Sequence, residues 1–345
     1  MQIYYIAISA FIAALVACFS LMPVVICFSK HKGISDRPDD RHHKNDLKLR
    51  FGGAAPFIAF TLVISLFAAT SSLRTALIAG GLLAAAIGAL DDIKGLKPLQ
   101  KLILLTMAAA VPVYLGIRIE WITVFGKVIV FGAWSIPVTI VWILVLTNAM
   151  NLIDGLDGLA SGISVISALT LAVTAFIMGQ TDMAVIACCL CGVCLGFMPF
   201  NIHPAKITLG DTGALFIGYT FALLSIDGLF KMSTTVSYLI PAVLFSLPLT
   251  DVIVSALRRS RKGCRITIGD RGHLHYRLAD TGLGVVKTVT LFHLLTVLNA
   301  LGAVLIALGM KIPGVCAVAV SAISVVFLYC RCGYINRKNK MEDAP

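Results

Sequence analysis

The feature that most constrains this chain is a series of apolar segments, each close to the length of a helix that crosses a lipid bilayer. A hydrocarbon core about 30 Å thick needs roughly 20 apolar residues per helix. Only 13% of the residues are charged and 59% are hydrophobic, whereas about a quarter are charged in a soluble domain. We therefore predict an all-α integral membrane protein of about eleven transmembrane helices, forming one polytopic domain over residues 1–345. The predicted spans are 3–28, 53–69, 75–90, 99–117, 134–148, 159–178, 183–198, 212–229, 235–255, 286–309 and 312–330.

The basic residues predict the orientation of these helices. With the N-terminus outside, 23 of the 28 Lys and Arg residues fall on the inner side, and such residues concentrate on the cytoplasmic side of membrane proteins. We expect the C-terminus in the cytoplasm and the protein in the inner membrane, surrounded by membrane lipids. The outer stretch 117–133 alternates apolar and polar residues, which predicts a small hairpin. The predicted inner loops are 30–51, 91–101, 149–158, 199–211 and 256–287.

Two carboxylates stand side by side at the start of the second inner loop. Asp91 and Asp92 directly follow an apolar run, and several lysines follow them. Adjacent carboxylates repel each other unless a cation, a shared proton or water relieves the repulsion. Because Mg²⁺ takes oxygen ligands and commonly bridges to substrate phosphates, the pair suits a phosphate-handling site. The alternative is a solvated helix terminus.

A regular polar row marks the third inner loop. Asn151, Asp154 and Asp157 recur at every third residue, so a helical conformation would place all three on one stripe. The glycines between them would let a ligand approach closely. A glycine-rich helix connection with capping Asp residues would account for one Asp but not for the regular spacing. We therefore favour a functional row.

Asp211 directly precedes an apolar segment. It fits two roles: an N-cap of the following helix, or a metal ligand. The N-terminus of a helix that opens onto the cytoplasm also favours anions such as phosphate.

The last inner loop is basic and ends in two histidines, His273 and His275. Binding of anionic lipid head groups would explain the arginines but not the histidines. Side chains at i and i+2 cannot share a helix face, but they can converge from a loop or an extended strand. No Cys-rich partner motif completes a zinc site, so phosphate contact or proton transfer fits the two histidines better.

Taken in order, five stretches resemble the polyprenyl-phosphate N-acetylhexosamine-1-phosphate transferase family of glycosyltransferases. In that family, an eleven-helix protein with a cytoplasmic active site uses Mg²⁺ and a UDP-sugar. The resemblance implies Mg²⁺ as cofactor, with Mn²⁺ as a substitute, and UDP-N-acetylhexosamine and polyprenyl phosphate as substrates. The stretches are D-R-P-D-D-R-H-H-K…G-G at 36–53, G-A-L-D-D at 88–92, N-A-M-N-L-I-D-G-L-D-G-L at 148–159, P-A-K-I-T-L-G-D-T-G at 204–213 and D-R-G-H-L-H-Y-R-L at 270–278.

The same resemblance implies roles for individual residues. Asp211 becomes the leading Mg²⁺ ligand, with Asn151 or Asp154 as a second contributor. Asp91 and Asp92 become the catalytic candidates that activate the lipid phosphate or help to hold the metal.

Substrate contacts are implied at several loops. Lys101 and His273 would meet the phosphates of the nucleotide or of the lipid, and His273 is also a catalytic candidate. Asn151 and Asp157 would face the nucleotide. The substrate-binding candidates together are Lys101, Asn151, Asp154, Asp157, Arg271 and His275.

Two stretches depart from the family pattern. The first loop has Leu47 and Leu49 where the family has prolines, which leaves the roles of His42 and His43 open. The last motif has Tyr276 after His275, whereas the peptidoglycan branch, which transfers phospho-MurNAc-pentapeptide, carries three consecutive histidines there.

We therefore expect transfer of an N-acetylhexosamine-1-phosphate, GlcNAc-1-phosphate first, to undecaprenyl or another polyprenyl phosphate with release of UMP. The alternatives are phospho-MurNAc-pentapeptide transfer, a secondary transporter and a non-catalytic lipid-binding scaffold. A transporter would place ionisable groups near the bilayer midplane on broken helices, and the predicted spans are almost free of them. We expect no nucleic acid partner, and a dimer stays open.

Overall fold

The computed structural model describes residues 2–35, 48–124, 127–230, 240–241, 243–261 and 272–342. Helices make up nearly all of the described chain, as the long apolar runs predict. The elements, in chain order, are α1 (Gln2–Lys32), α2 (Ala54–Phe67), α3 (Ser72–Lys94), α4 (Pro98–Tyr114), β1 (Trp121–Val124), β2 (Lys127–Val130), η1 (Gly132–Trp134), α5 (Ser135–Ile153), α6 (Leu159–Ile177), α7 (Thr181–Asn201), α8 (Gly210–Leu224), η2 (Ser225–Phe230), α10 (Ser246–Arg261), α11 (Leu274–Leu278), η3 (Ala279–Leu283), α12 (Gly284–Ala307) and α13 (Lys311–Glu342).

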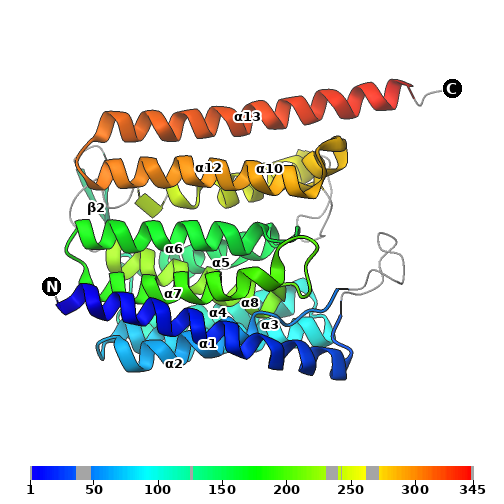
Figure 1. The fold of residues 1–345 in the computed structure, drawn as a ribbon. Coiled ribbons are helices and arrows are strands. Elements are labelled where there is room, and N and C mark those ends of the chain that lie inside the picture. Colours follow the sequence, from blue (N-terminus) through cyan, green and yellow to red (C-terminus); the bar gives the residue numbers. More distant parts are fainter. Residues whose placement is uncertain are drawn as a thin grey trace.

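The long helices lie side by side in one bundle (Figure 1). α1 and α6 pack against α7, α3 and α5 pack against α8, and α12 packs against α6 and α13. Glycines bring these helices close together. A Cβ on Gly192 of α7 would meet the Phe11 carbonyl oxygen of α1, and a Cβ on Gly218 of α8 would lie 2.7 Å from the Thr147 Cα of α5. Small residues at helix interfaces are typical of membrane bundles, where close packing replaces the hydrophobic effect between helices.

The described residues contain seven helices that are long and apolar enough to cross a membrane. Every one of the eleven predicted spans overlaps a helix of the structure. The all-α membrane class is therefore confirmed, while the number of crossings and the orientation stay predictions. The seven helices are Gln2–Lys32, Ser72–Lys94, Gly132–Ile153, Leu159–Ile177, Thr181–Asn201, Leu274–Ala307 and Lys311–Arg331, and the shorter apolar helices are Ala54–Phe67, Pro98–Tyr114 and Ser246–Ser255.

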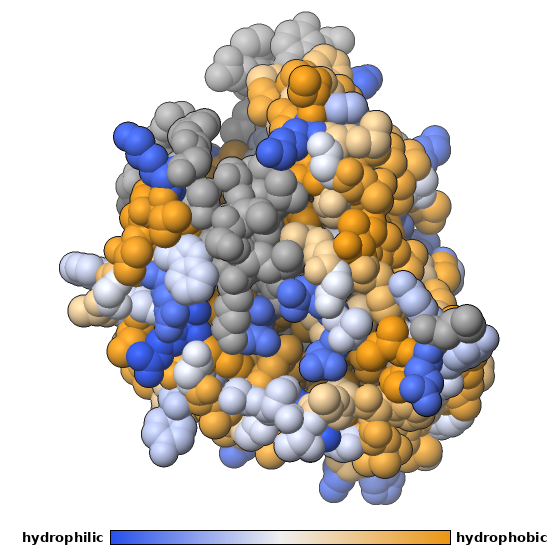
Figure 2. All heavy atoms as spheres, turned by 90° about the vertical axis from the view of Figure 1, so that its left-hand side faces the viewer, coloured by the Kyte–Doolittle hydropathy of each residue, from blue (hydrophilic) through white to orange (hydrophobic). Residues whose placement is uncertain are grey.

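The helices at the margin of the bundle expose large apolar side chains. Ile8 and Ile12 of α1, and Ile323 and Phe327 of α13, are all more than half exposed. Figure 2 looks onto the end of the bundle with the N-terminus and the hairpin, and hydrophobic residues cover much of its rim. Exposed apolar surface of this extent marks contact with a membrane or a partner.

The predicted hairpin within 117–133 is confirmed. β1 and β2 pair antiparallel, with Trp121 opposite Val130 and Val124 opposite Lys127. The hairpin lies near the N-terminus at one end of the bundle, and the C-terminus lies at the other end (Figure 1).

Candidate active site

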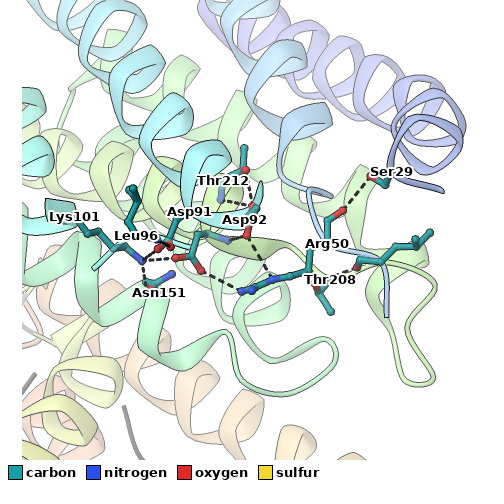
Figure 3. A network of polar contacts seen from close by, with 11 residues as sticks. Ser29, Arg50, Asp91, Asp92, Leu96, Lys101, Asn151, Thr208 and Thr212 are labelled. Carbon is teal, nitrogen blue, oxygen red and sulfur yellow. Dashed lines mark hydrogen bonds and ion pairs between the residues drawn. The ribbon is translucent and has the colours of Figure 1, made fainter. Parts of the chain in front are cut away.

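Residues of three predicted motifs meet Lys101 at one end of the helix bundle (Figure 3). Asp91 and Asp92 lie in the last turn of α3, Lys101 in the first turn of α4, Asn151 near the end of α5 and Asp211 in the first turn of α8. Lys101 and Asp211 are separated by 110 positions in the chain. The packing of four helix ends therefore assembles this cluster.

Lys101 is at the centre of the cluster. Its Nζ lies 3.0 Å from Asp91 Oδ2 and 3.2 Å from Asn151 Oδ1, and it also pairs with Asp211. The second oxygen of Asp91 accepts a hydrogen bond of 2.6 Å from the Leu96 amide, which closes the turn after α3. Three side-chain oxygens from three helices therefore converge on one cationic atom.

Asp211 is held between two cations. Arg50 Nη2 lies 3.3 Å from its Oδ1, on the side opposite to Lys101. Burial tends to raise the pKa of the Asp211 carboxyl, but the hydrogen bond with Asp91 and the charges of Lys101 and Arg50 hold that pKa well below its usual range. Asp211 lies where the 199–211 loop enters α8, and its carboxylate is ionised at neutral pH.

Asp92 points into the N-terminus of α8 instead of toward Lys101. Its carboxylate accepts hydrogen bonds from Asp211 N at 2.9 Å, Thr212 N at 3.0 Å and Thr212 Oγ1 at 2.6 Å. A carboxylate in this position satisfies free helix amides and complements the helix dipole. Asp92 rather than Asp211 caps α8, so the N-cap alternative for Asp211 is wrong. Asp92 is only 7% exposed, so it is not a solvated helix end.

The predicted helical row of Asn151, Asp154 and Asp157 is wrong. α5 ends at Ile153, and Asp154 has non-helical backbone angles of φ −77° and ψ 43°. Gly158 then takes φ +79°, a left-handed conformation that favours glycine. The chain turns between Asp154 and Asp157, so Asn151 joins the Lys101 cluster while Asp157 lies elsewhere.

The Asp157 carboxylate forms hydrogen bonds that connect three segments of the chain: its own turn, the first inner loop and the loop after α7. Both of its oxygens lie 2.7 Å from Lys48 Nζ, and Oδ2 also contacts His203 Nδ1 at 2.8 Å and Ala205 N at 3.2 Å. Burial acts to raise the pKa of the Asp157 carboxyl, but the hydrogen bonds from these three residues outweigh it and lower the pKa. Asp157 thereby joins the first inner loop to the loop after α7.

A short extended segment carries Arg50 into the cluster. Leu49 forms bridges with Ser35 on one side and Ile207 on the other. Ser29 Oγ donates to the Arg50 carbonyl oxygen at 3.0 Å, as Figure 3 shows. The backbone around Arg50 is therefore fixed between the end of α1 and the segment that precedes α8.

The two histidines of the last motif converge on Asp251 of α10. His273 Nδ1 and His275 Nδ1 lie 3.1 Å and 3.2 Å from Asp251 Oδ2. The rings stack with their centroids 5.7 Å apart, because His273 has an extended backbone just before α11. The predicted convergence of the pair outside a common helix face is confirmed.

His275 links this cluster to the turn after α5. A Cβ on Gly155 would lie 2.6 Å from His275 Nε2 and would also meet the Tyr276 hydroxyl. The turn that follows Asn151 therefore lies against His275 and Tyr276. Arg271, His42 and His43 lie outside the described residues.

Comparison with known proteins gives consistent matches. Residues 74–229 match glycosyl transferase family 4. The probable undecaprenyl-phosphate N-acetylglucosaminyl 1-phosphate transferase of Bacillus subtilis is 33% identical over 300 residues, which cover 86% of this chain and 84% of that protein. This chain belongs to glycosyl transferase family 4.

Other relatives in the family differ in the acceptor or the sugar that their names give. Decaprenyl-phosphate N-acetylglucosaminephosphotransferase of Mycobacterium tuberculosis H37Rv is 30% identical over 329 residues, covering 84% of this chain and 80% of that protein. Phospho-N-acetylmuramoyl-pentapeptide-transferase of Caldicellulosiruptor bescii is 29% identical over 315 residues, covering 85% and 95%. The likeness to all three extends over most of each chain.

Several residues at this candidate site escape prediction from sequence. Lys48 and Arg50 stand among many basic residues whose charge the positive-inside rule already explains. His203 directly precedes the 204–213 stretch, but nothing in the sequence pairs it with Asp157. Asp251 does carry a signal, because a lone carboxylate within an apolar span needs a partner.

The oxygen donors of the candidate site fit a divalent cation in part. Among the described residues, no group of three or more His, Cys, Asp or Glu side chains is arranged to hold a metal ion. Asp91, Asn151 and Asp211 nevertheless direct oxygens at a common point, which the Lys101 ammonium now takes. Mg²⁺ is usually held by only one or two carboxylates, with water and substrate phosphates as its other ligands. This donor set is therefore suited to Mg²⁺.

Proposed function

We propose that this protein transfers an N-acetylhexosamine-1-phosphate, most directly GlcNAc-1-phosphate, from a UDP-sugar to undecaprenyl or another polyprenyl phosphate, with release of UMP. The observation that carries the proposal is the cluster of Asp91, Lys101, Asn151, Asp211 and Arg50 at the end of an apolar helix bundle. Such a cluster can handle phosphates next to a lipid. The product would start a lipid-linked cell-envelope glycan.

The transfer would proceed by attack of an acceptor phosphate oxygen on the β-phosphorus of the UDP-sugar. The bond between that phosphorus and the bridging oxygen breaks, and UMP leaves with the electron pair. Phosphoryl transfer depends mainly on positioning and charge neutralisation. Lys101 and Arg50 supply positive charge on two sides of Asp211, and Asp91 is placed to orient the acceptor or to accept its proton.

We assign the Mg²⁺ site to Asp211, with Asn151 as a second oxygen donor and Asp91 nearby. When bound, Mg²⁺ would neutralise charge on the diphosphate, and Mn²⁺ would be accepted by the same oxygens. Lys101 would then move its ammonium toward the phosphates. Asp154, in the turn after α5, stays a candidate for metal or substrate contact.

Two observations support N-acetylglucosamine as the sugar. The names of the Bacillus and Mycobacterium relatives both specify N-acetylglucosamine, and the last motif reads His273-Leu274-His275-Tyr276 without three consecutive histidines. Phospho-MurNAc-pentapeptide transfer is the second candidate, because a relative of that name aligns over 85% of this chain. Purified enzyme offered equal concentrations of UDP-GlcNAc, UDP-GalNAc and UDP-MurNAc-pentapeptide should make mainly lipid-linked GlcNAc. A dominant lipid-linked MurNAc-pentapeptide product would instead support the second candidate.

The reaction itself is tested by UMP release. Purified protein with UDP-GlcNAc, polyprenyl phosphate and Mg²⁺ should release UMP in step with formation of the lipid-linked sugar. Chelation should abolish both signals, and Mn²⁺ should restore them. Omission of the polyprenyl phosphate is the matched control. Folded protein that consumes no UDP-sugar would contradict the reaction. Turnover that persists after chelation would contradict the metal requirement.

A further inference from the structure

The Asp251 carboxylate gathers four hydrogen-bond donors in the interior of the described structure. Oδ1 accepts from Leu274 N at 2.8 Å and from the Tyr329 hydroxyl at 2.6 Å. Oδ2 faces His273 Nδ1 and His275 Nδ1 at 3.1 Å and 3.2 Å. Asp251 is 3% exposed. A buried carboxylate is costly unless it is well hydrogen-bonded, and here each donor belongs to the last motif or to α13.

These contacts determine which ring nitrogen each histidine presents. A carboxylate accepts hydrogen bonds, so the ring proton facing Asp251 lies on Nδ1 of both histidines. A second contact agrees for His273, because Arg259 Nη2 lies 3.3 Å from its Nε2, and a guanidinium can only donate. Nε2 is therefore the atom that each ring presents away from Asp251.

His275 Nε2 is buried and has no hydrogen-bond partner within the described structure. It lies beside Gly155, in the turn that follows Asn151. An unsatisfied buried nitrogen costs about 1–3 kcal/mol. The ring is nonetheless held in this orientation by its Nδ1 contact with Asp251.

We infer that Asp251 is a positioning residue of the active site: it holds His273 and His275 in the Nδ1–H form with Nε2 presented, and Tyr329 ties this arrangement to α13. The inference rests on the proposed function, because the Nδ1–H form leaves Nε2 as a proton acceptor, which proton transfer at the acceptor phosphate would use. A carboxylate that fixes the tautomer and orientation of a working imidazole serves this purpose in other enzymes.

The direct test is Asp251→Asn, read by nitrogen NMR of imidazole-labelled protein. The amide replaces one acceptor oxygen by an NH₂ group, which cannot accept the Nδ1 protons. The ring proton of His275 should therefore shift from Nδ1 toward Nε2, whereas Arg259 at Nε2 should keep the His273 proton on Nδ1. Resonances are assigned through His273→Gln and His275→Gln. Asp182→Asn, an exposed change in the first turn of α7, is the control and should leave the spectra unaltered. Unchanged histidine spectra in Asp251→Asn would overturn the inference.

Activity provides the second test. Asp251→Asn should lower kcat for UMP release by about 100-fold, with a smaller change in KM for the UDP-sugar. Tyr329→Phe should lower kcat by less than about 10-fold, since the contacts between Asp251 and the histidines remain. In a His273→Gln, His275→Gln background, Asp251→Asn should cause no further loss. A full additional loss there would mean that Asp251 acts only through stability and would overturn the inference.

The two tests separate this inference from the proposed function. Folded wild-type protein that releases no UMP would contradict the reaction, whereas the tautomer measurement would still decide the role of Asp251. If Asp251→Asn does not fold, Tyr329→Phe takes its place in the NMR experiment: the inference expects both rings to keep Nδ1–H while their line widths increase. Loss of the Nδ1 protons in that variant would overturn it.

Discussion

Asp91 and Asp92, adjacent at the end of α3, have different surroundings, so substitutions at the two positions should have different effects. Asp91 faces the Lys101 ammonium, whereas Asp92 caps α8 through the amides of Asp211 and Thr212. The side chains leave the helix in different directions, so one reaches the cation cluster and the other reaches the neighbouring helix. Substitution of Asp91 and substitution of Asp92 should therefore impair different properties of the protein.

Asp92→Asn should mainly reduce stability, and Asp91→Asn should mainly reduce activity. Loss of a capping carboxylate costs about 0.5–2 kcal/mol, because an amide cannot accept all of the hydrogen bonds from α8. Asp91→Asn keeps an oxygen for the Leu96 amide but removes the charge beside Lys101. Thermal unfolding and UMP release, measured on both variants, check this division; equal, mild losses in both would contradict it.

Asp211→Asn should reduce turnover by about 10³-fold or more and leave the unfolding temperature close to that of the wild type. The change removes the charge between Lys101 and Arg50 but preserves the shape of the side chain. Lys101 still has Asp91 at 3.0 Å, and Arg50 Nε still has Asp92 at 3.5 Å. UMP release and thermal unfolding are the measurements, with Asp182→Asn as the control. Activity within a few-fold of the wild type would show that the metal assignment is wrong.

At the scale of elements, the close contact of α3 with α8 sets the position of Asp211. A Cβ on Gly88 would overlap the Asp211 backbone, whereas a Cβ on Gly81 would lie 3.6 Å from the Phe216 ring. Both glycines lie in α3 and face α8. Of these two glycines, Gly88 is the one that allows the two helices to approach beside the cluster.

Gly88→Ala should therefore destabilise the protein by about 1–3 kcal/mol and reduce UMP release, because α8 and its Asp211 must move away. Gly81→Ala is the matched control. It should leave activity unchanged and preserve or raise stability, since Ala favours a helix over Gly by up to about 1 kcal/mol. Thermal unfolding and activity of the two variants, compared under the same conditions, check the prediction. Equal behaviour of the two variants would argue against the packing contact.

For the whole molecule, the orientation in the membrane is the main open prediction. The hairpin lies near the N-terminus, and the C-terminus lies at the other end of the bundle (Figure 1). The distribution of Lys and Arg assigns the end with the C-terminus to the cytoplasm. Single cysteines placed at the two ends would distinguish the two orientations.

In a variant without native cysteines, Leu283→Cys should be labelled by an impermeant reagent only from the cytoplasmic side, because it lies in the predicted inner loop 256–287. Val128→Cys in β2 should be labelled only from outside. The two positions are 37% and 58% exposed, so both are accessible to a reagent. Intact cells and inside-out vesicles provide the two sides. Reversed labelling would invert the predicted topology.

The sequence by itself determined the membrane class, the approximate helices, the hairpin and the family resemblance. These properties depend on local patterns: apolar run length, alternation and short motifs such as G-A-L-D-D at 88–92. Hydropathy predicts membrane helices well because lipid offers no hydrogen-bond partners, so every backbone N–H and C=O group must be hydrogen-bonded within the helix. The polar row at 151–157 is the exception, since its spacing predicts a helix but α5 ends at Ile153 and the chain turns before Gly158, which is left-handed.

Only the tertiary structure decided which polar residues meet. Arg50 reaches Asp211 across 161 positions, and Lys48 reaches Asp157 across 109. The different contacts of Asp91 and Asp92 depend on where α4 and α8 lie. No local sequence pattern contains the positions of these helices. Long-range polar contacts follow from the packing of whole helices through small residues. The sequence therefore predicts the chemical groups of the site, and the helix packing decides their partners.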